Sequence, residues 1–339
     1  MKNQKEHIAP QNPSIYHIGI DLMGSDVNPT QLLDSILNSL DQFPPSAHLT
    51  LFATSDILAG KHSPSPHIAL QVVPEFISMK ENPLSAIRNK KQSSICIGMN
   101  LLKEKKLNAF VSSGNTGALI ASSKLFLPML PGITRPALLT PLPTRNKSIA
   151  MLDVGANTSC RAEQLVQFAL IGSAYQKRNN VLRPKVGLLN IGSEAQKGTP
   201  ELRKAHELLQ RIDPSILHFI GNIEARDVFQ GELDVLVTDG FTGNIFLKTA
   251  EGIASVILEQ FQQIADQESS PQLQNTFLEL HKRLHYAEYP GAILCGIDRI
   301  VMKCHGNAAS QSLINTIICS IQLLEHKFLE KVTSHLASN

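Results

Sequence analysis

The 339-residue sequence predicts an α/β fold in three α/β/α layers, with helices on both sides of a mostly parallel sheet. Short apolar, β-branched runs alternate with segments in which apolar residues recur every three or four positions, the patterns of buried strands and amphipathic helices. Several strands also end in turns that contain Gly and Asn and lead into helices. In a parallel sheet such turns gather beyond the carboxyl ends of the strands, where ligands bind.

Composition narrows the class of protein. A hydrophobic content of 42% supports a large core, and 31 Lys and Arg against 29 Asp and Glu argue against a nucleic-acid partner. The five cysteines include no C-x-x-C pair, so neither a zinc site nor a disulfide framework is expected. No segment resembles a signal peptide or a membrane span. We therefore expect a soluble, cytoplasmic protein, at most peripheral to the inner face of a membrane, with no metal.

The first third of the chain predicts a tail and then alternating elements. Residues 1–14 are polar and read as a loose tail, and residues 15–339 as one domain of two lobes that share a sheet. After an apolar strand at 15–22, Asn28 and Pro29 carry the features that start a helix. Apolar runs at 49–53 and 68–73 predict strands on either side of a polar loop. A helix is expected from about 85 to 105, where a basic cluster (Arg88, Lys90, Lys91) indicates a solvated face more than a landing site for an acidic partner.

The remaining elements follow the same alternation. Apolar runs predict strands at 109–112, 149–154, 185–191, 216–220 and 300–304, and residues 132–138 lead into another short strand after three prolines. Leu165, Phe168, Ala169, Gly172 and Tyr175 share one face of a predicted helix. Thr199 and Pro200 open the next helix, and a last amphipathic helix follows the strand at 300–304.

Residues 234–252 form the stretch around which the other units are organised. A buried strand at 234–238 is followed by a tight turn at 239–243, in which Gly240 and Gly243 are free to take positive φ. A helix is then expected from Asn244, with Phe246, Ala250, Ile253, Ile257 and Phe261 on one face. Its unpaired N–H groups and positive end form a ready site for an anion, although such glycines often only close a turn.

Similar turns recur at other predicted strand ends. They carry Gly114 with Asn115 and Thr116, Gly155 with Asn157, Gly192, Gly221 with Asn222, Gly243 with Asn244, and Gly306 with Asn307. Glycine lets the backbone approach a ligand, and asparagine supplies a donor and an acceptor, although asparagine also suits helix caps. No glycine fingerprint for nucleotides and no nucleophile elbow is present, so we expect no nucleotide cofactor.

Seven of these stretches together resemble one enzyme family. The runs DLMGSDVNP, SSGNTGAL, LDVGANTSC, LLNIGSEAQKG, FIGNIEARD, DGFTGN and the glycine-rich 289–307 occur in the order seen in bacterial fatty acyl-ACP:phosphate acyltransferases of phospholipid synthesis, over about 18–324. Ser25, Ser193, Pro290 and Ile293 depart from the family's usual residues. The resemblance implies a fold similar to phosphotransacetylases and to the isocitrate dehydrogenase type, and a homodimer without a cofactor.

The resemblance also implies a reaction and its partners. Acyl carrier protein (ACP) would deliver an acyl thioester, inorganic phosphate would attack it, and the acyl phosphate would feed phosphatidic acid synthesis through a membrane glycerol-3-phosphate acyltransferase. Phosphate is itself the nucleophile, so no covalent acyl-enzyme is expected. The site must hold phosphate in line with the carbonyl and must supply donors to the tetrahedral oxyanion.

Three residues are predicted to be catalytic. Lys197 would place a positive charge on phosphate, Asn244 would position phosphate or donate to the oxyanion, and His305 would orient phosphate or protonate the leaving thiol. Further phosphate contacts are expected at Gly114, Asn115, Thr116, Arg135, Asn157, Gly240, Thr242, Gly243 and Gly306. A solvent-exposed lysine, a helix cap, a core histidine and a surface ion pair are the respective alternatives for Lys197, Asn244, His305 and Arg135. Asp153 and Asp239 are expected to brace turns.

Two rival functions stay open at this point. A metal- and NAD-dependent hydroxyacid dehydrogenase on the same superfold would need a cluster of carboxylates around a divalent ion. A non-catalytic protein that docks acyl-ACP or a membrane would bind the carrier but release no thiol. The resemblance implies that a helix pair near 244–286 carries the dimer contact and touches the bilayer. Its polar turn at 267–272 favours a weak peripheral membrane contact.

Overall fold

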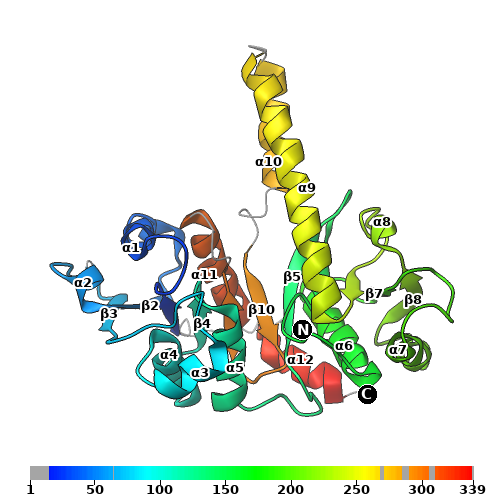
Figure 1. Ribbon diagram of the computed structural model, residues 1–339, viewed down its shortest axis with the longest axis horizontal. Helices are drawn as coiled ribbons and strands as arrows, with labels where there is room; N and C mark the ends of the chain where they lie inside the picture. Colours follow the sequence, from blue (N-terminus) through cyan, green and yellow to red (C-terminus); the bar gives the residue numbers. More distant parts are fainter. Residues whose placement is uncertain (1–14, 64, 268–270, 285–289, 305–309, 338–339) are drawn as a thin grey trace, which may run out of the picture.

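A computed structural model describes residues 15–63, 65–267, 271–284, 290–304 and 310–337, and shows the predicted α/β architecture (Figure 1). The expected tail at 1–14 lies outside the described residues. The strands are β1 (Tyr16–Asp21), β2 (Ala47–Ala53), β3 (Ile68–Val72), β4 (Ala109–Ser112), β5 (Ala137–Pro143), β6 (Ser148–Leu152), β7 (Lys185–Leu189), β8 (His218–Ile223), β9 (Val235–Val237), β10 (Ala292–Cys295) and β11 (Ile300–Lys303).

The helices between these strands pack against the sheet. They are α1 (Pro29–Leu37), α2 (Ser55–Leu58), α3 (Pro83–Asn89), α4 (Ser94–Lys103), α5 (Thr116–Phe126), α6 (Ala162–Arg178), α7 (Pro200–Gln210), α8 (Ala225–Val228), α9 (Gly240–Gln267), α10 (Pro271–Leu284), α11 (Ser310–Glu325) and α12 (Phe328–Ala337), with a 3-10 turn at Leu40–Gln42. In Figure 1, α1 and α11 lie above β2 and β4, while α3, α4 and α5 lie below them, which gives three layers. One continuous core of buried apolar side chains extends from Ile18 to Val332.

The described strands form one 11-stranded sheet in the order β3-β2-β1-β4-β11-β10-β5-β6-β9-β7-β8. The first five strands in this order are parallel to one another, and so are the last four. Between the two sets, the β11–β10, β10–β5 and β5–β6 pairs are all antiparallel, so the two parallel sets run in opposite directions.

The register brings the carboxyl ends of both parallel sets to the middle of the sheet. One row of paired residues crosses the whole centre, namely Val111, Met302, Ile293, Leu139, Leu152 and Val237. β4 and β11 end one residue beyond this row, and β6 and β9 end on it. The turns were expected at one shared edge of the sheet. They lie instead near its centre, on either side of β10 and β5, where the strands of the two parallel sets end. This offset positions the candidate site described below.

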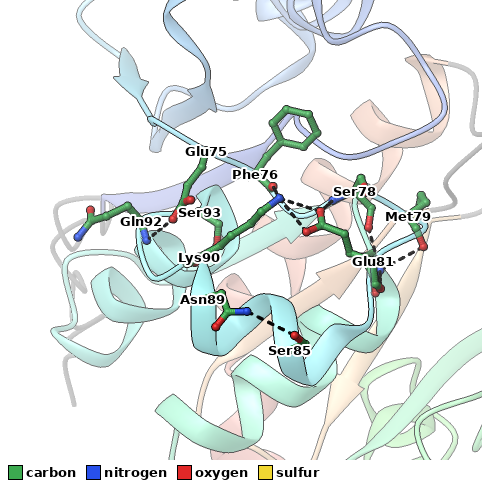
Figure 2. A network of polar contacts seen from close by, with 11 residues as sticks. Glu75, Phe76, Ser78, Met79, Glu81, Ser85, Asn89, Lys90, Gln92 and Ser93 are labelled. Carbon is green, nitrogen blue, oxygen red and sulfur yellow. Dashed lines mark hydrogen bonds and ion pairs between the residues drawn. The ribbon is translucent and has the colours of Figure 1, made fainter.

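The single helix expected at 85–105 is two helices, α3 and α4, and the prediction was wrong at 90–93. Lys90 leaves helical geometry, with φ −109° and ψ 67°, and its ammonium donates to the Phe76 carbonyl (2.9 Å) and to Glu81 (2.8 Å). The backbone N–H of Gln92 donates to the Glu75 carboxylate (3.0 Å). Figure 2 shows these contacts, which tie the break to the preceding loop. Contacts distant in sequence thus replace the helical hydrogen bonds.

Other differences are smaller. Gly221 and Asn222 lie inside β8 and not after it, at a point where the β7–β8 register shifts. The last amphipathic helix is two helices, because the chain takes a positive φ at Lys327 between α11 and α12. β10 is a short strand that the sequence patterns did not single out. Asn28 and Pro29 do start α1, with the Asn28 side chain accepting from the Thr30 N–H, as predicted.

Helices α9 and α10 form a hairpin that projects from the body between the two groups of helices (Figure 1). Phe261 and Phe277 stack across the hairpin, with ring centroids 6.1 Å apart. Ile253 and Ile257, which belong to the predicted apolar stripe of α9, are about half exposed, and so is Ile264 further along the same helix. In the described part of the chain, no helix combines the length and the apolar character needed to span a bilayer.

Candidate active site

Asp153 holds the turn that follows β6. Its side chain is fully buried and accepts hydrogen bonds from the backbone N–H groups of Leu138 (3.0 Å), Gly155 (3.1 Å), Ala156 (2.9 Å) and Asn157 (2.8 Å). Burial raises the pKa of this carboxyl, and the hydrogen bonds from the backbone oppose the rise. Asp153 therefore braces the turn, as predicted from the sequence.

The first turn of α9 packs directly on this Asp153 turn. The helix begins at Gly240, four residues earlier than predicted, and neither Gly240 nor Gly243 has a positive φ. A Cβ atom on Gly243 would lie 1.9 Å from the Asp153 carbonyl oxygen, and one on Gly240 would lie 2.5 Å from the Asn157 carbonyl oxygen. These two glycines thus permit close approach between two backbones, which corrects the predicted role in a turn with positive φ.

Asp239 caps α9 and orients its first turn. Its carboxylate accepts from the Thr242 N–H (2.9 Å) and the Thr242 hydroxyl (2.8 Å), so Asp239 braces the helix start as predicted. Asn244 follows in the next turn with an exposed side chain, and its Cβ lies 3.8 Å from where a Cβ on Gly155 would be. The side-chain amide of Asn244 is therefore held beside the turn after β6.

A second strand–turn–helix unit lies across the sheet, at the end of β4. The Asn115 side chain accepts from the Ala118 N–H (3.0 Å) and caps α5, while its amide group donates to the Ser78 carbonyl (3.0 Å) and to other carbonyls of the loop before α3. Asn115 is 5% exposed and acts as the cap that was its alternative reading. Thr116, the first residue of α5, is the side chain of this unit that lines a cavity.

The two units face one another across a central cavity of about 540 Å³. The central cavity is lined by residues that include Asp26 and Met79 from loops, Thr116 from α5, Asn244 and Lys248 from α9, and Lys303 from β11. Side chains at the carboxyl ends of both parallel sets therefore meet in one space. The central cavity thus brings together two predicted residues, Thr116 and Asn244.

Lys303 is a residue of the central cavity that the sequence analysis missed. Although it ends a buried strand, it is only 7% exposed, and its ammonium donates to the carbonyls of Ser113 (3.2 Å) and Cys304. Burial lowers its pKa to about 8, against the attraction of the nearby Asp21 and Asp26 carboxylates. A lysine that ends an otherwise apolar strand, just before a glycine-rich turn, is the signal that could have identified it.

Asp21 is a fully buried carboxyl at the end of β1, which is separated from β11 by β4. It accepts from the Ser112 hydroxyl (2.7 Å) and from the Met23 N–H (3.0 Å). Burial raises its pKa to about 6, while the hydrogen bonds and the Lys303 charge oppose the rise. The Asp21 carboxyl therefore lies close enough to Lys303, which lines the central cavity, for each group to affect the pKa of the other.

Other predicted residues lie apart from the central cavity. Arg135 and Thr242 line a peripheral cavity of about 420 Å³, together with Cys160, Arg161 and Thr199. The Asn157 amide donates to Asp153 (2.8 Å) and to the Pro136 carbonyl (2.7 Å), so it braces the turn.

Three further predicted residues need separate comment. Lys197 is exposed on the loop between β7 and α7 and lines neither cavity. Gly114 packs against the loop after β1, where a Cβ would lie 2.9 Å from the Met23 carbonyl oxygen. His305 and Gly306 lie outside the described residues.

The described residues do not form a typical metal site. No group of three or more His, Cys, Asp or Glu side chains in the described ranges is arranged to hold a metal ion. Lys248, which faces the central cavity, forms an ion pair with Glu251 at 2.6 Å. The polar groups of this cavity are thus the ammonium groups of Lys248 and Lys303, the carboxylates of Asp26 and Glu251, and hydroxyl and amide side chains.

Comparisons with known proteins agree with this architecture. Residues 16–331 match a family model described as "Fatty acid synthesis protein". Phosphate acyltransferases of Chlamydia abortus and Thermoanaerobacter pseudethanolicus are 41% and 38% identical, covering 94% and 95% of this chain and 99% and 97% of theirs. A phosphotransacetylase from Streptococcus pyogenes has a similar structure, with a TM-score of 0.61 and 15% identity over 91% of this chain and 94% of that one. The predicted likeness to the phosphotransacetylase fold is confirmed.

Proposed function

This chain belongs to the fatty acid synthesis protein family and is a phosphate acyltransferase, and we propose that it transfers the acyl group of acyl-ACP to inorganic phosphate. The products would be an acyl phosphate and free ACP, with the acyl phosphate feeding phosphatidic acid synthesis. Relatives that carry the name phosphate acyltransferase match this chain over almost their whole length, which supports the reaction class.

The central cavity carries the proposal, because it collects anion-binding groups from both parallel sets of strands. Lys303 and Lys248 supply positive charge, Thr116 supplies a hydroxyl at the N-terminus of α5, and Asn244 supplies an amide in the second turn of α9. A helix N-terminus favours an anion through its N–H groups and its dipole. Phosphate held among these groups would have ammonium groups and the N-terminus of α5 beside it.

The chemistry requires no protein nucleophile. A phosphate oxygen attacks the thioester carbonyl, a C–O bond forms, and the C–S bond breaks as the tetrahedral intermediate collapses. The leaving thiol has an ordinary pKa of about 8.5 and departs as thiolate without strong acid help. Asn244 would position phosphate or donate to the carbonyl oxygen as negative charge develops on it.

Several residues enter this proposal from the sequence alone. Lys197 would approach phosphate from the β7–α7 loop, and His305 would orient phosphate or protonate the thiol. Gly114, Asn115, Asn157, Gly240, Gly243 and Gly306 would shape the phosphate site. Arg135 and Thr242, also predicted as phosphate contacts, line the peripheral cavity and would not touch phosphate in the central cavity.

The proposal also includes partners and location. The enzyme would act in the cytoplasm as a homodimer without a cofactor, take its acyl group from ACP, and pass acyl phosphate to a membrane glycerol-3-phosphate acyltransferase. Weak contact of the α9–α10 hairpin with the inner face of the membrane would place the product near that acceptor. Exposed apolar residues on α9 would also suit docking of acyl-ACP, so binding of the carrier has to be distinguished from transfer of its acyl group.

One assay distinguishes transfer of the acyl group to phosphate from mere binding of acyl-ACP. Purified protein is incubated with acyl-ACP, with and without phosphate; free ACP thiol is measured with a thiol reagent, and acyl phosphate is trapped with hydroxylamine. We expect thiol release that depends on phosphate and matches the trapped product one to one. Binding of acyl-ACP without phosphate-dependent thiol release would contradict the proposed reaction.

A further inference from the structure

An apolar cavity lies beside the central cavity, at the base of the α9–α10 hairpin. It has a volume of about 100 Å³, and its lining includes Pro141, Leu142, Phe229, Ala250, Ala254 and Leu284. Thr140, Leu247 and Glu251 line both this apolar cavity and the central cavity. The two spaces therefore share a wall. The central cavity has a mixed lining of polar and apolar residues, whereas the apolar cavity is lined mainly by apolar ones.

Two prolines in β5 explain why this space is open. β5 pairs with β6 as far as Pro143, but within the described residues its pairing with β10 stops at Leu139. Pro141 and Pro143 have no backbone N–H, so this stretch of β5 cannot complete a ladder with a further strand. Their rings instead form part of the cavity wall.

Polarity changes sharply at the shared wall. On the apolar side, the Phe229 ring stacks on Phe246, with ring centroids 5.5 Å apart, and closes the cavity beside α9. On the central side, the Glu251 carboxylate is paired with Lys248 at 2.6 Å. A ligand that bridges the wall therefore needs a polar head and an apolar tail.

We propose that the apolar cavity binds the first methylene groups of the acyl chain, next to the thioester carbonyl. The inference rests on the proposed function and names the chain-binding part of the same site. In this arrangement the thioester carbonyl lies beside Thr140 and Leu247, and phosphate attacks it from the central cavity. The acyl chain continues past Ala250 into the apolar cavity. The cavity has roughly three times the volume of one water molecule in the liquid, which leaves room for a few methylene groups.

The proposal predicts a chain-length profile. Each buried methylene contributes about 0.8 kcal/mol, which is about fourfold in kcat/KM. With ACP donors that carry acetyl, butyryl, hexanoyl and octanoyl groups, kcat/KM should therefore rise steeply over the first methylenes and then level off as the cavity fills. Equal kcat/KM for acetyl and octanoyl donors would overturn the inference and leave the proposed function standing.

Filling the cavity is the second test. Ala250→Leu places a larger side chain in the apolar cavity, and we expect it to lower the octanoyl-to-acetyl ratio of kcat/KM at least tenfold, with the phosphate KM unchanged. Thr249→Leu is the matched control, because Thr249 is the exposed neighbour on the same helix and adds the same leucine outside the cavity. A ratio that stays the same in Ala250→Leu, or falls equally in both variants, would contradict the proposal.

A binding measurement tests the cavity without catalysis. The chain contains no tryptophan, so Phe229→Trp introduces a single fluorophore in the cavity wall. Octanoate should shift its emission in a saturable way, and the added Ala250→Leu substitution should remove the shift. If no acyl-ACP donor is turned over but octanoate still binds here, the proposed reaction fails and the cavity assignment stands. If octanoate leaves the emission unchanged, the cavity assignment fails.

Discussion

Lys303→Gln is expected to weaken phosphate binding in the central cavity. Glutamine retains a side-chain donor for the carbonyls of Ser113 and Cys304 but removes the buried positive charge. A hydrogen bond to a charged group contributes roughly 1.5–3 kcal/mol, so the phosphate KM should rise about ten- to hundredfold. Because the acyl chain does not contact Lys303 in this scheme, the KM for acyl-ACP should change much less.

The pH dependence gives a second signature of Lys303. Burial lowers its pKa from the ordinary 10.5 to about 8, so the ammonium is present below pH 8 and is lost as pH rises through 8. Phosphate affinity in the unmodified enzyme should therefore fall above pH 8, and Lys303→Gln should lack this fall. Between pH 8 and 10.5 the unfolded chain binds more protons at this lysine, so its contribution to stability rises with pH in that window.

Phosphate-dependent thiol release, measured from pH 6.5 to 9.5, tests both effects. Lys124→Gln is the matched control, because Lys124 is exposed on α5. Thermal unfolding of both variants establishes that they fold. A folded Lys303→Gln enzyme with a phosphate KM within twofold of the unmodified value, or with an unchanged fall above pH 8, would refute the assignment of Lys303 to phosphate.

Three further predictions concern the loop lysine, the helix contact and the membrane. Lys197→Ala should lower turnover about a hundredfold, the scale of a lost preorganised charge contact, and Lys197→Arg should not restore it fully; near-normal phosphate saturation in the alanine variant would argue against this role. Gly243→Ala should destabilise the protein by the upper part of the roughly 1–3 kcal/mol range for overpacking, because its Cβ would lie 1.9 Å from the Asp153 carbonyl oxygen. Gly252→Ala, whose Cβ meets open space, should instead stabilise α9 by up to about 1 kcal/mol, and urea unfolding distinguishes the two. Vesicle co-sedimentation should show weak, salt-sensitive binding with the dimer independent of lipid; tight binding at high salt, abolished by Phe277→Glu without loss of the dimer, would contradict this.

The strand–turn–helix units could be predicted because their signals are local. The apolar run of β9 and the period that starts α9 lie within one stretch, and Asn28 with Pro29 mark the start of α1. The role of the glycines in 239–243 could not be predicted in the same way. They are required by the Asp153 turn, which is about 90 residues earlier in the chain and is brought close only by the sheet.

The break between α3 and α4 and the role of Lys303 were missed for a related reason. Lys90 leaves the helix because Glu81 and the Phe76 carbonyl hold its ammonium, and nothing in the pattern at 85–105 encodes that contact. Lys303 acquires its environment from β4 and from α9, which are distant in sequence. The asparagines were ambiguous because an asparagine before a helix can either cap it or contact a ligand. Asn115 caps α5, as asparagine commonly does.

The reversal of strand direction between the two parallel sets was also beyond the sequence patterns. Apolar runs indicate strands, but they do not indicate which strands pair or in which direction. Two of the three antiparallel pairings at the centre of the sheet involve a strand, β10, that was not recognised, and the third joins β5 to β6. The mostly parallel sheet was confirmed, while the meeting of carboxyl ends at its centre could be found only from the register.

Helix α9 connects the central cavity with the far end of the α9–α10 hairpin. Its 28 residues span about 42 Å, with Asn244 in the central cavity at one end and the hairpin tip at the other. For a rigid rod of this length, a sideways displacement of about 5 Å at the tip corresponds to a tilt of roughly 7° at the base. At Gly240 and Gly243 the helix backbone lies directly against the Asp153 turn, so such a tilt would displace that turn. A displacement of the distant hairpin would therefore reach the residues that line the central cavity with a smaller amplitude.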